Sequence, residues 1–235
     1  MKTIFFISVF LMICVFSFTA NAQQTIFNVP TTDVLGYGKV YVEFDAAFKL
    51  DRTAQFGRFS SFVPRVVVGV GGNVEVGLNV TGNIQPGDDS TTLVPNVKWK
   101  FYENKKKDTA LIAGTNFYIP VRNRSYDAGA YTYLAVSKTI NKTRLTAGGY
   151  VATKNVFAAK AVRAGGQFGV EQTINSKFSL AADWITGRHS AGYFTPGVIY
   201  KPHPKVTTYF SYSIGNDQAV KGNHFFLFEL GYNFN

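Results

Sequence analysis

Residues 40–49 read VYVEFDAAFK, and this stretch indicates how the chain folds. Every even position in it is apolar, whereas most odd positions, including Glu43 and Asp45, are polar or charged. Successive side chains of a β-strand point to opposite faces of the sheet. The stretch therefore predicts a strand with one apolar face and one charged face.

The same two-residue period returns through the rest of the chain. It is found in residues 62–70, 74–81, 93–102, 111–119, 131–139, 144–151, 166–172, 178–185, 194–201, 206–214 and 225–234. No window after Ala22 has the period of an amphipathic helix. The connections alternate between tight turns, such as Gly71-Gly72-Asn73, and mostly longer loops. The sequence therefore predicts an all-β fold of about twelve antiparallel strands.

Alternation alone fits a water-soluble sandwich as well as a barrel. Strands of about nine to eleven residues match a tilted span of a bilayer, and an even strand number with tight turns at one end is typical of membrane barrels. The charged face divides evenly between acids and bases: Glu43, Asp45, Glu75, Glu171, Asp183 and Glu229 against Lys49, Arg65, Lys98, Lys100, Arg144 and Lys201. A sheet in lipid must close on itself. Residues 38–235 are therefore predicted to form a single transmembrane antiparallel up-and-down β-barrel, and a secreted sandwich or soluble barrel is the alternative.

The first 22 residues have the features of a secretory signal peptide. Lys2 is followed by an uncharged run over residues 4–18 and by the small-x-small site Ala20-Asn21-Ala22. This run is shorter than the roughly 20 residues that a membrane helix needs. Cleavage after Ala22 would remove Cys14, the chain's one cysteine. Residues 23–37 are expected to form a short N-terminal periplasmic segment that tucks into the mouth of the barrel, and the bacterial outer membrane is the expected location.

Four stretches resemble a known group of proteins. They are NVPTTDVL at 28–35, GKVYVE at 38–43, FVPRVVVG at 62–69 and FELGYNF at 228–234. They look like uncharacterised bacterial outer-membrane barrels and are loosely similar to the family named after the meta-pathway of phenol degradation, whose members are regarded as transporter candidates. The resemblance implies the fold and the membrane rather than a substrate. The last residue, Asn235, differs from the terminal aromatic residue common in such proteins.

The strand alternation also predicts which side chains line the lumen. The candidates are Tyr41, Glu43, Asp45, Arg65, Glu75, Asn96, Lys98, Lys100, Tyr118, Arg144, Tyr150, Glu171, Asp183, Lys201, Tyr209 and Glu229, with Tyr102 and Tyr133 as further inward tyrosines. The lumen of a twelve-stranded barrel is wider than the lumen of an eight-stranded barrel, which side chains fill. It is narrower than the lumen of an open porin. We expect a channel or transporter for small solutes, with anionic and aromatic solutes as candidates. The alternative is a closed structural or surface-interaction barrel without transport activity.

The remaining residues offer little chemistry. The three histidines, His189, His203 and His224, fall in loops, a turn or a strand end. The candidate acid–histidine pairs are Asp183 with His189 and Asp217 with His224, and loop positions that arise without any catalytic role explain all three histidines better. No enzyme, cofactor or metal site is expected. We attribute the formal net charge of +10 to lysines and arginines at the ends of the barrel, because their side chains can reach lipid headgroups there. The expected partners are therefore outer-membrane lipid, the outer-membrane assembly machinery and small solutes, and not nucleic acid.

Overall fold

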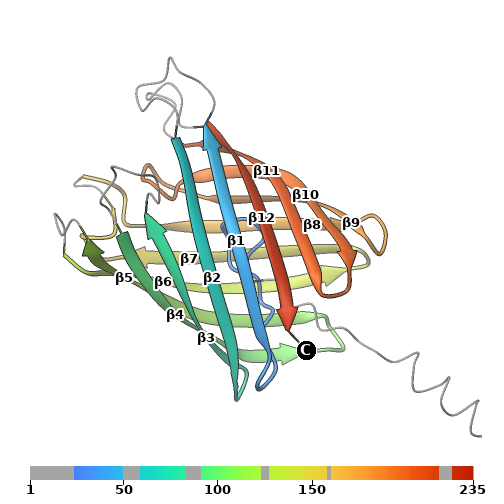
Figure 1. Ribbon diagram of the computed structural model, residues 1–235. Coiled ribbons are helices and arrows are strands. Elements are labelled where there is room, and N and C mark those ends of the chain that lie inside the picture. Colours follow the sequence, from blue (N-terminus) through green and yellow to red (C-terminus); the bar gives the residue numbers. More distant parts are fainter. Residues whose placement is uncertain are drawn as a thin grey trace, which may run out of the picture.

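The computed structural model describes residues 24–49, 59–82, 91–122, 127–157, 160–216 and 224–234. Twelve strands account for most of these residues (Figure 1). They are β1 (Val40–Lys49), β2 (Phe59–Gly71), β3 (Val74–Gly82), β4 (Thr91–Asn104), β5 (Thr109–Arg122), β6 (Gly129–Ile140), β7 (Thr143–Ala152), β8 (Ala164–Thr173), β9 (Phe178–Ile185), β10 (Tyr193–His203), β11 (Val206–Gly215) and β12 (His224–Phe234). Each predicted strand is present, and most extend a few residues further than the alternation indicated.

The strands close into one antiparallel barrel. Each strand pairs with its neighbours in the chain, and β12 returns to pair with β1. The closing register joins Val40 to Phe234 and Phe48 to Phe226. Closure pairs the backbone of each of the twelve described strands on both sides, which leaves none of them with a free edge. The predicted all-β, twelve-stranded up-and-down barrel is therefore confirmed, and the described residues include no helix long and apolar enough to cross a membrane.

The two faces of the sheet differ in chemistry as the sequence predicts. Phe44 and Leu230 are paired across the β1–β12 seam and are each 43% exposed on the outside. Their chain neighbours Glu43 and Glu229 point inward and are each 1% exposed. Apolar side chains on the outside and charged side chains in the interior are the reverse of a water-soluble protein. This arrangement is the one expected of a barrel surrounded by lipid.

Tight turns close one end of the barrel, the same end at which β1 begins and β12 ends. Gly72 and Asn73 connect β2 to β3 with φ angles of 60° and 58°. Asn141, between β6 and β7, has a φ of 56°. Glycine and asparagine tolerate this left-handed conformation, which a two-residue hairpin turn requires. We call this end the turn end and the opposite end the loop end.

One predicted side assignment is wrong. Tyr102 was expected to face the lumen, but the β4–β5 register moves from Lys100 opposite Ile112 to Tyr102 opposite Leu111, so β4 carries one extra residue there. A β-bulge of this kind reverses the alternation beyond it. Tyr102 therefore shares the outer face with Leu111 and is 45% exposed.

Candidate functional site

The lumen contains a part of the chain that does not belong to the sheet. Residues 24–37, which we call the plug segment, precede β1, and residues 24–35 of this segment run inside the barrel (Figure 1). Ile26 and Val29 are 0% exposed. Ile26 packs in a cluster with Tyr209, and Val29 packs in a second cluster with Tyr131. The N-terminal segment therefore lies deeper in the barrel than the mouth, into which the sequence predicts that it tucks.

The tip of the plug segment is bound by one carboxylate. The backbone N–H groups of Phe27, Asn28 and Val29 all donate to Oδ2 of Asp183, with distances of 3.0, 2.5 and 2.8 Å. Successive N–H groups directed at one point form an anion-binding nest. The Asn28 side chain adds a bond of 3.0 Å to Oγ1 of Thr195 on β10. Hydrogen bonds to a charged acceptor are stronger than neutral ones, so Asp183 is the principal anchor of the tip.

A buried ion pair holds the two arms of the plug segment. Nζ of Lys98 lies 2.9 Å from Oε1 of Glu75, and both side chains are almost fully buried. Lys98 donates to the Gln24 side chain at 3.3 Å and to the Thr31 carbonyl at 3.4 Å. Oε2 of Glu75 accepts the backbone N–H of Leu35 at 2.8 Å. The pair therefore contacts the chain both before and after the tip.

A third charged group binds the plug segment at the turn end. Arg144 on β7 donates to both carboxylate oxygens of Glu171 at 2.5 and 2.9 Å, and its remaining amino group donates to Asp33 at 2.7 Å. The planar guanidinium of arginine carries donors along more than one edge, so it can bind the two carboxylates at the same time. Strand-borne charges thus anchor the plug segment at three places along its length.

Two glycines of the barrel wall leave room for the plug segment. A Cβ atom at Gly69 on β2 would lie 2.0 Å from the Gly36 carbonyl oxygen. A Cβ atom at Gly169 on β8 would lie 2.1 Å from Cδ1 of Ile26. A residue other than glycine at position 69 would meet backbone atoms and displace the segment, whereas one at position 169 would force the end of the Ile26 side chain to move. These glycines of the barrel wall therefore provide space that the plug segment occupies.

The plug segment separates the cavities of the lumen. A cavity of about 320 Å³ on the loop-end side has plug residues, including Phe27 and Asn28, in its wall. Cavities of about 340 and 250 Å³ lie toward the turn end, and Asp33 of the plug segment borders both. The plug segment therefore divides the lumen into one cavity on the loop-end side and two cavities toward the turn end.

The structure places the sixteen predicted lumen residues on the inner face, but it does not distribute their charges evenly. The carboxylates of Glu43, Asp45, Glu229 and Asp183 lie around the plug tip, and the guanidinium of Arg65 contacts two of them, Glu43 and Asp45. The other predicted inner side chains, which complete the wall, are Tyr41, Glu75, Asn96, Lys98, Lys100, Tyr118, Arg144, Tyr150, Glu171, Lys201 and Tyr209. Lys100, Arg144 and Lys201 lie toward the turn end. The side chain of Lys49 lies outside the described residues.

Several residues that contribute to the site were not identified from the sequence. Thr195 on β10, Gly69 and Gly169 contact the plug segment, and Asn79 and Asn116 line the loop-end cavity. Threonine, glycine and asparagine are common in strands and turns for other reasons, so they give no separate signal. Glycines at inward positions of otherwise regular strands were the one available indication of a close backbone approach.

The considered pairing of Asp183 with His189 is not formed. Asp183 binds the plug segment, whereas Nε2 of His189 lies 2.6 Å from the hydroxyl of Tyr150 and its ring stacks on Phe157 at 4.0 Å. Burial in this loop lowers the pKa of His189. The second considered pair includes Asp217, which lies outside the described residues. That the protein is not an enzyme stays a prediction.

Known proteins share the fold of this chain at low sequence identity. No family model matches the sequence, and a search of curated proteins gives no match. The solved structures include the KdgM porin in complex with disordered oligogalacturonate, with a TM-score of 0.55, 8% identity and coverage of 82% of this chain and 98% of that one. They also include the NanC porin (TM-score 0.52, 12% identity, 83% and 99% coverage) and an outer-membrane channel from Pseudomonas putida F1 (0.50, 11%, 86% and 97%).

These likenesses establish the fold and nothing finer. Identities of 8% to 12% leave the resemblance to the phenol-degradation family as a prediction. The chain is a closed β-barrel with the architecture of outer-membrane porins and channels.

Proposed function

We propose that this protein is a small-solute channel of the bacterial outer membrane and that its plug segment holds the channel closed. The belt of exposed apolar side chains supports a lipid environment, because water-soluble proteins seldom expose such a surface. Removal of residues 1–22 would leave Gln23 as the first residue, next to the start of the plug segment. A segment with one free end can leave the lumen without unfolding the barrel.

The observation that carries this proposal is how the lumen is filled. A barrel with only a structural role can fill its interior with strand side chains, as small barrels do. Here the strands present Asp183, Glu75, Lys98 and Arg144, and each is bonded to a detachable segment. Water can replace the plug segment at charged groups with little penalty, whereas an apolar core would resist its departure. The charged groups of the wall therefore have hydrogen-bond partners in both states, from the plug segment when the lumen is closed and from water when it is open.

The wall favours small polar solutes. Asn79, Asn96 and Asn116 line the loop-end cavity together with Tyr118 and Tyr133. The four carboxylates around the plug tip outnumber the one guanidinium among the described residues there. A narrow passage with this balance attracts cations. We therefore propose that the opened channel prefers cations, although the overall charge of the chain is positive.

A second candidate function is a permanently closed barrel with a structural or surface-interaction role. The apolar part of the plug segment favours it, because Ile26 and Val29 are fully buried. Exposing each of these side chains to water would cost about 1.5 to 3 kcal/mol. The two candidates differ in whether the lumen conducts when the segment is absent.

Recordings in planar lipid bilayers test the proposal. The chain beginning at Gln23 is expected to be closed for most of the time, and a variant without residues 24–34 is expected to show steady openings with a reversal potential that indicates cation preference. Asp183→Ala, which removes the acceptor of three backbone N–H groups, should give intermittent openings. Thr195→Val, which loses the Asn28 side-chain bond and a bond to Ser213 but keeps the three backbone bonds to Asp183, is the matched control and should stay closed.

Folding of each variant is checked by its heat-sensitive mobility in gel electrophoresis. A folded variant without residues 24–34 that passes no current would support the closed barrel and reject the channel. Anion preference in the open variant would reject the proposed selectivity while leaving the channel in place.

A further inference from the structure

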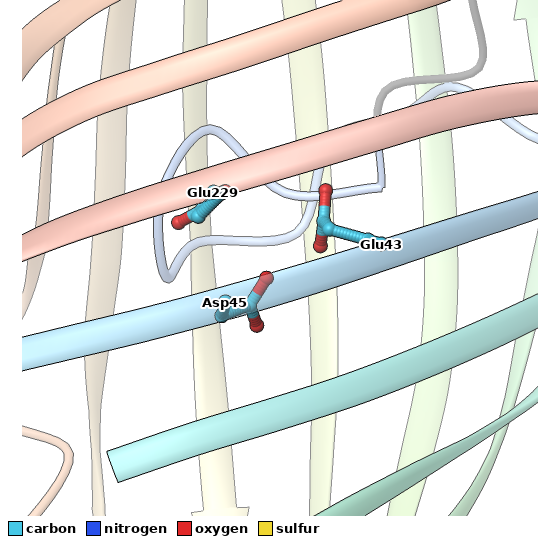
Figure 2. Close-up of side chains that lie close together, drawn as sticks. All are labelled: Glu43, Asp45 and Glu229. Atoms are coloured by element: carbon cyan, nitrogen blue, oxygen red, sulfur yellow. The ribbon is translucent and has the colours of Figure 1, made fainter. Parts of the chain in front are cut away.

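Three acidic side chains meet inside the barrel where its first and last strands join. Glu43 and Asp45 lie two residues apart on β1, and Asp45 is directly opposite Glu229 on β12. One carboxylate oxygen from each lies within 4.8 Å of the other two. Figure 2 shows the three side chains on the inner side of β1 and β12, with the plug segment behind them. All three residues are buried.

One cation among the described residues contacts this cluster, and it does not balance it. Arg65 on β2 lies 2.6 Å from Oε1 of Glu43 and 3.1 Å from Oδ2 of Asp45. Tyr41 donates its hydroxyl hydrogen to Oε2 of Glu43. Three carboxylates against one guanidinium leave two negative charges in the wall. Buried charges of this kind require a compensating ion or proton.

Two of the carboxylate oxygens that Arg65 does not engage have no partner in the described part of the chain. Oε2 of Glu229 and Oδ1 of Asp45 are buried without a hydrogen bond, and Glu229 is 1% exposed. The hydroxyl of Tyr209 is also buried without a partner, and Tyr209 is directly opposite Glu229 on the same inner face. Unpaired buried polar atoms are rare in proteins. Several of them around one acidic cluster indicate an additional ligand.

We propose that Glu43, Asp45 and Glu229 bind a divalent cation, Ca²⁺, at the seam between β1 and β12. A dication neutralises the two charges that Arg65 leaves. Ca²⁺ takes oxygen ligands at about 2.3 to 2.6 Å, so two oxygens on opposite sides of it are separated by about 4.6 to 5.2 Å. Three oxygens that all lie within 4.8 Å of one another can therefore reach one Ca²⁺ together.

The chemical nature of the coordinating atoms indicates which cation the site would bind. It consists of carboxylates and a phenol, with no histidine or cysteine in the cluster, so zinc and copper are disfavoured. Glu43 and Asp45 are partly engaged by Arg65, which leaves an irregular set of oxygens. Ca²⁺ accepts irregular coordination, whereas Mg²⁺ requires a near-ideal octahedron. Asp45 and Glu229 also border the loop-end cavity, from which the ion and its remaining water ligands can arrive.

This site does not require channel activity, but its three carboxylates are among the four that carry the proposed cation preference, so bound Ca²⁺ would weaken that preference. Its ligands come from the two strands that close the barrel, and the directly paired Asp45 and Glu229 would repel each other without the ion. Bound Ca²⁺ would therefore fasten the seam. The expected consequence is a barrel whose thermal stability depends on Ca²⁺, whether or not the lumen conducts.

Calcium titration of the purified chain in a nonionic detergent tests this proposal. After treatment with EDTA, we expect one bound Ca²⁺ by calorimetry and a higher unfolding temperature in its presence. Tb³⁺ luminescence excited through tyrosine should appear and be displaced by Ca²⁺, because Tyr41 and Tyr209 adjoin the cluster. Asp45→Asn with Glu229→Gln should abolish all three signals. Glu103→Gln, at an exposed acid that pairs with Lys100, should retain them.

The amide substitutions remove buried charge and are expected to fold, and Glu229→Gln alone serves as a second variant. A chain that shows no calcium-dependent shift would overturn the site, since protons alone would then compensate the cluster. A shift of equal size in the double variant would also overturn it, because the ion would be bound elsewhere. Tighter binding of Mg²⁺ than of Ca²⁺ would overturn the assignment of the ion.

Discussion

Arg65→Met is expected to destabilise the barrel by about 3 to 5 kcal/mol, the usual cost of removing one partner of a buried ion pair. The guanidinium contacts Glu43 at 2.6 Å and Asp45 at 3.1 Å, so its loss leaves three neighbouring carboxylates without a protein cation. Methionine keeps much of the side-chain volume, which separates the electrostatic effect from a packing defect. Urea unfolding in lipid vesicles, followed by the fluorescence of Trp99 and Trp184, measures the loss in EDTA-containing buffer.

A second substitution identifies the cause of this loss. Glu43→Gln introduced together with Arg65→Met removes one of the orphaned charges and should restore part of the stability. Equal stability of Arg65→Met and the unaltered chain would show that the cluster is not an electrostatic unit. A loss that Glu43→Gln does not reduce would assign the effect to packing instead.

Leu230→Arg is expected to cost about 2 to 4 kcal/mol and to reduce insertion into lipid vesicles. Leu230 is 43% exposed on the outside of β12, opposite Phe44 at the seam. A cation on the lipid face near the middle of the bilayer carries a penalty of this size, which falls to about 0 to 1 kcal/mol near the interfaces. The fraction of heat-sensitive folded barrel after mixing with vesicles measures the effect.

The matched control for this prediction is Ile140→Arg. Ile140 is 50% exposed on the outside at the turn end, where an arginine can reach the headgroups. It should therefore insert almost as well as the unaltered chain. Equal insertion of both variants would contradict the placement of the apolar face in lipid.

The sequence contains enough information to predict the strands and most of their faces. In residues 40–49 and 225–234 the two-residue period assigns Glu43, Asp45 and Glu229 to the inner face, and the structure agrees. Alternation is a local property, so it can be read without the fold. It fails at Tyr102 because a single extra residue in β4 is set by the partner strand and not by the local pattern.

The site itself depends on distances along the chain that a periodic pattern does not encode. The bond between Asn28 and Asp183 spans 155 residues, and the sequence around Asn28 gives no indication of its partner. The pairing of Asp45 with Glu229 depends on the register at which β12 returns to β1. Equal numbers of acids and bases predict a balanced lumen, but numbers do not specify positions. Lys98 and Arg144 each pair with an acid, whereas Glu43, Asp45 and Glu229 share one arginine.

Thiol labelling at Val29 tests most directly whether the N-terminal segment occupies the lumen. The chain starting at Gln23 has no cysteine, so Val29→Cys introduces a unique thiol at a position that is 0% exposed. Tyr37→Cys, at a position that is 83% exposed, is the control. Reaction of folded protein in vesicles with a water-soluble maleimide should be fast at position 37 and many times slower at position 29, until denaturant removes the difference. Equal rates in the folded state would place the plug segment outside the barrel and contradict the account.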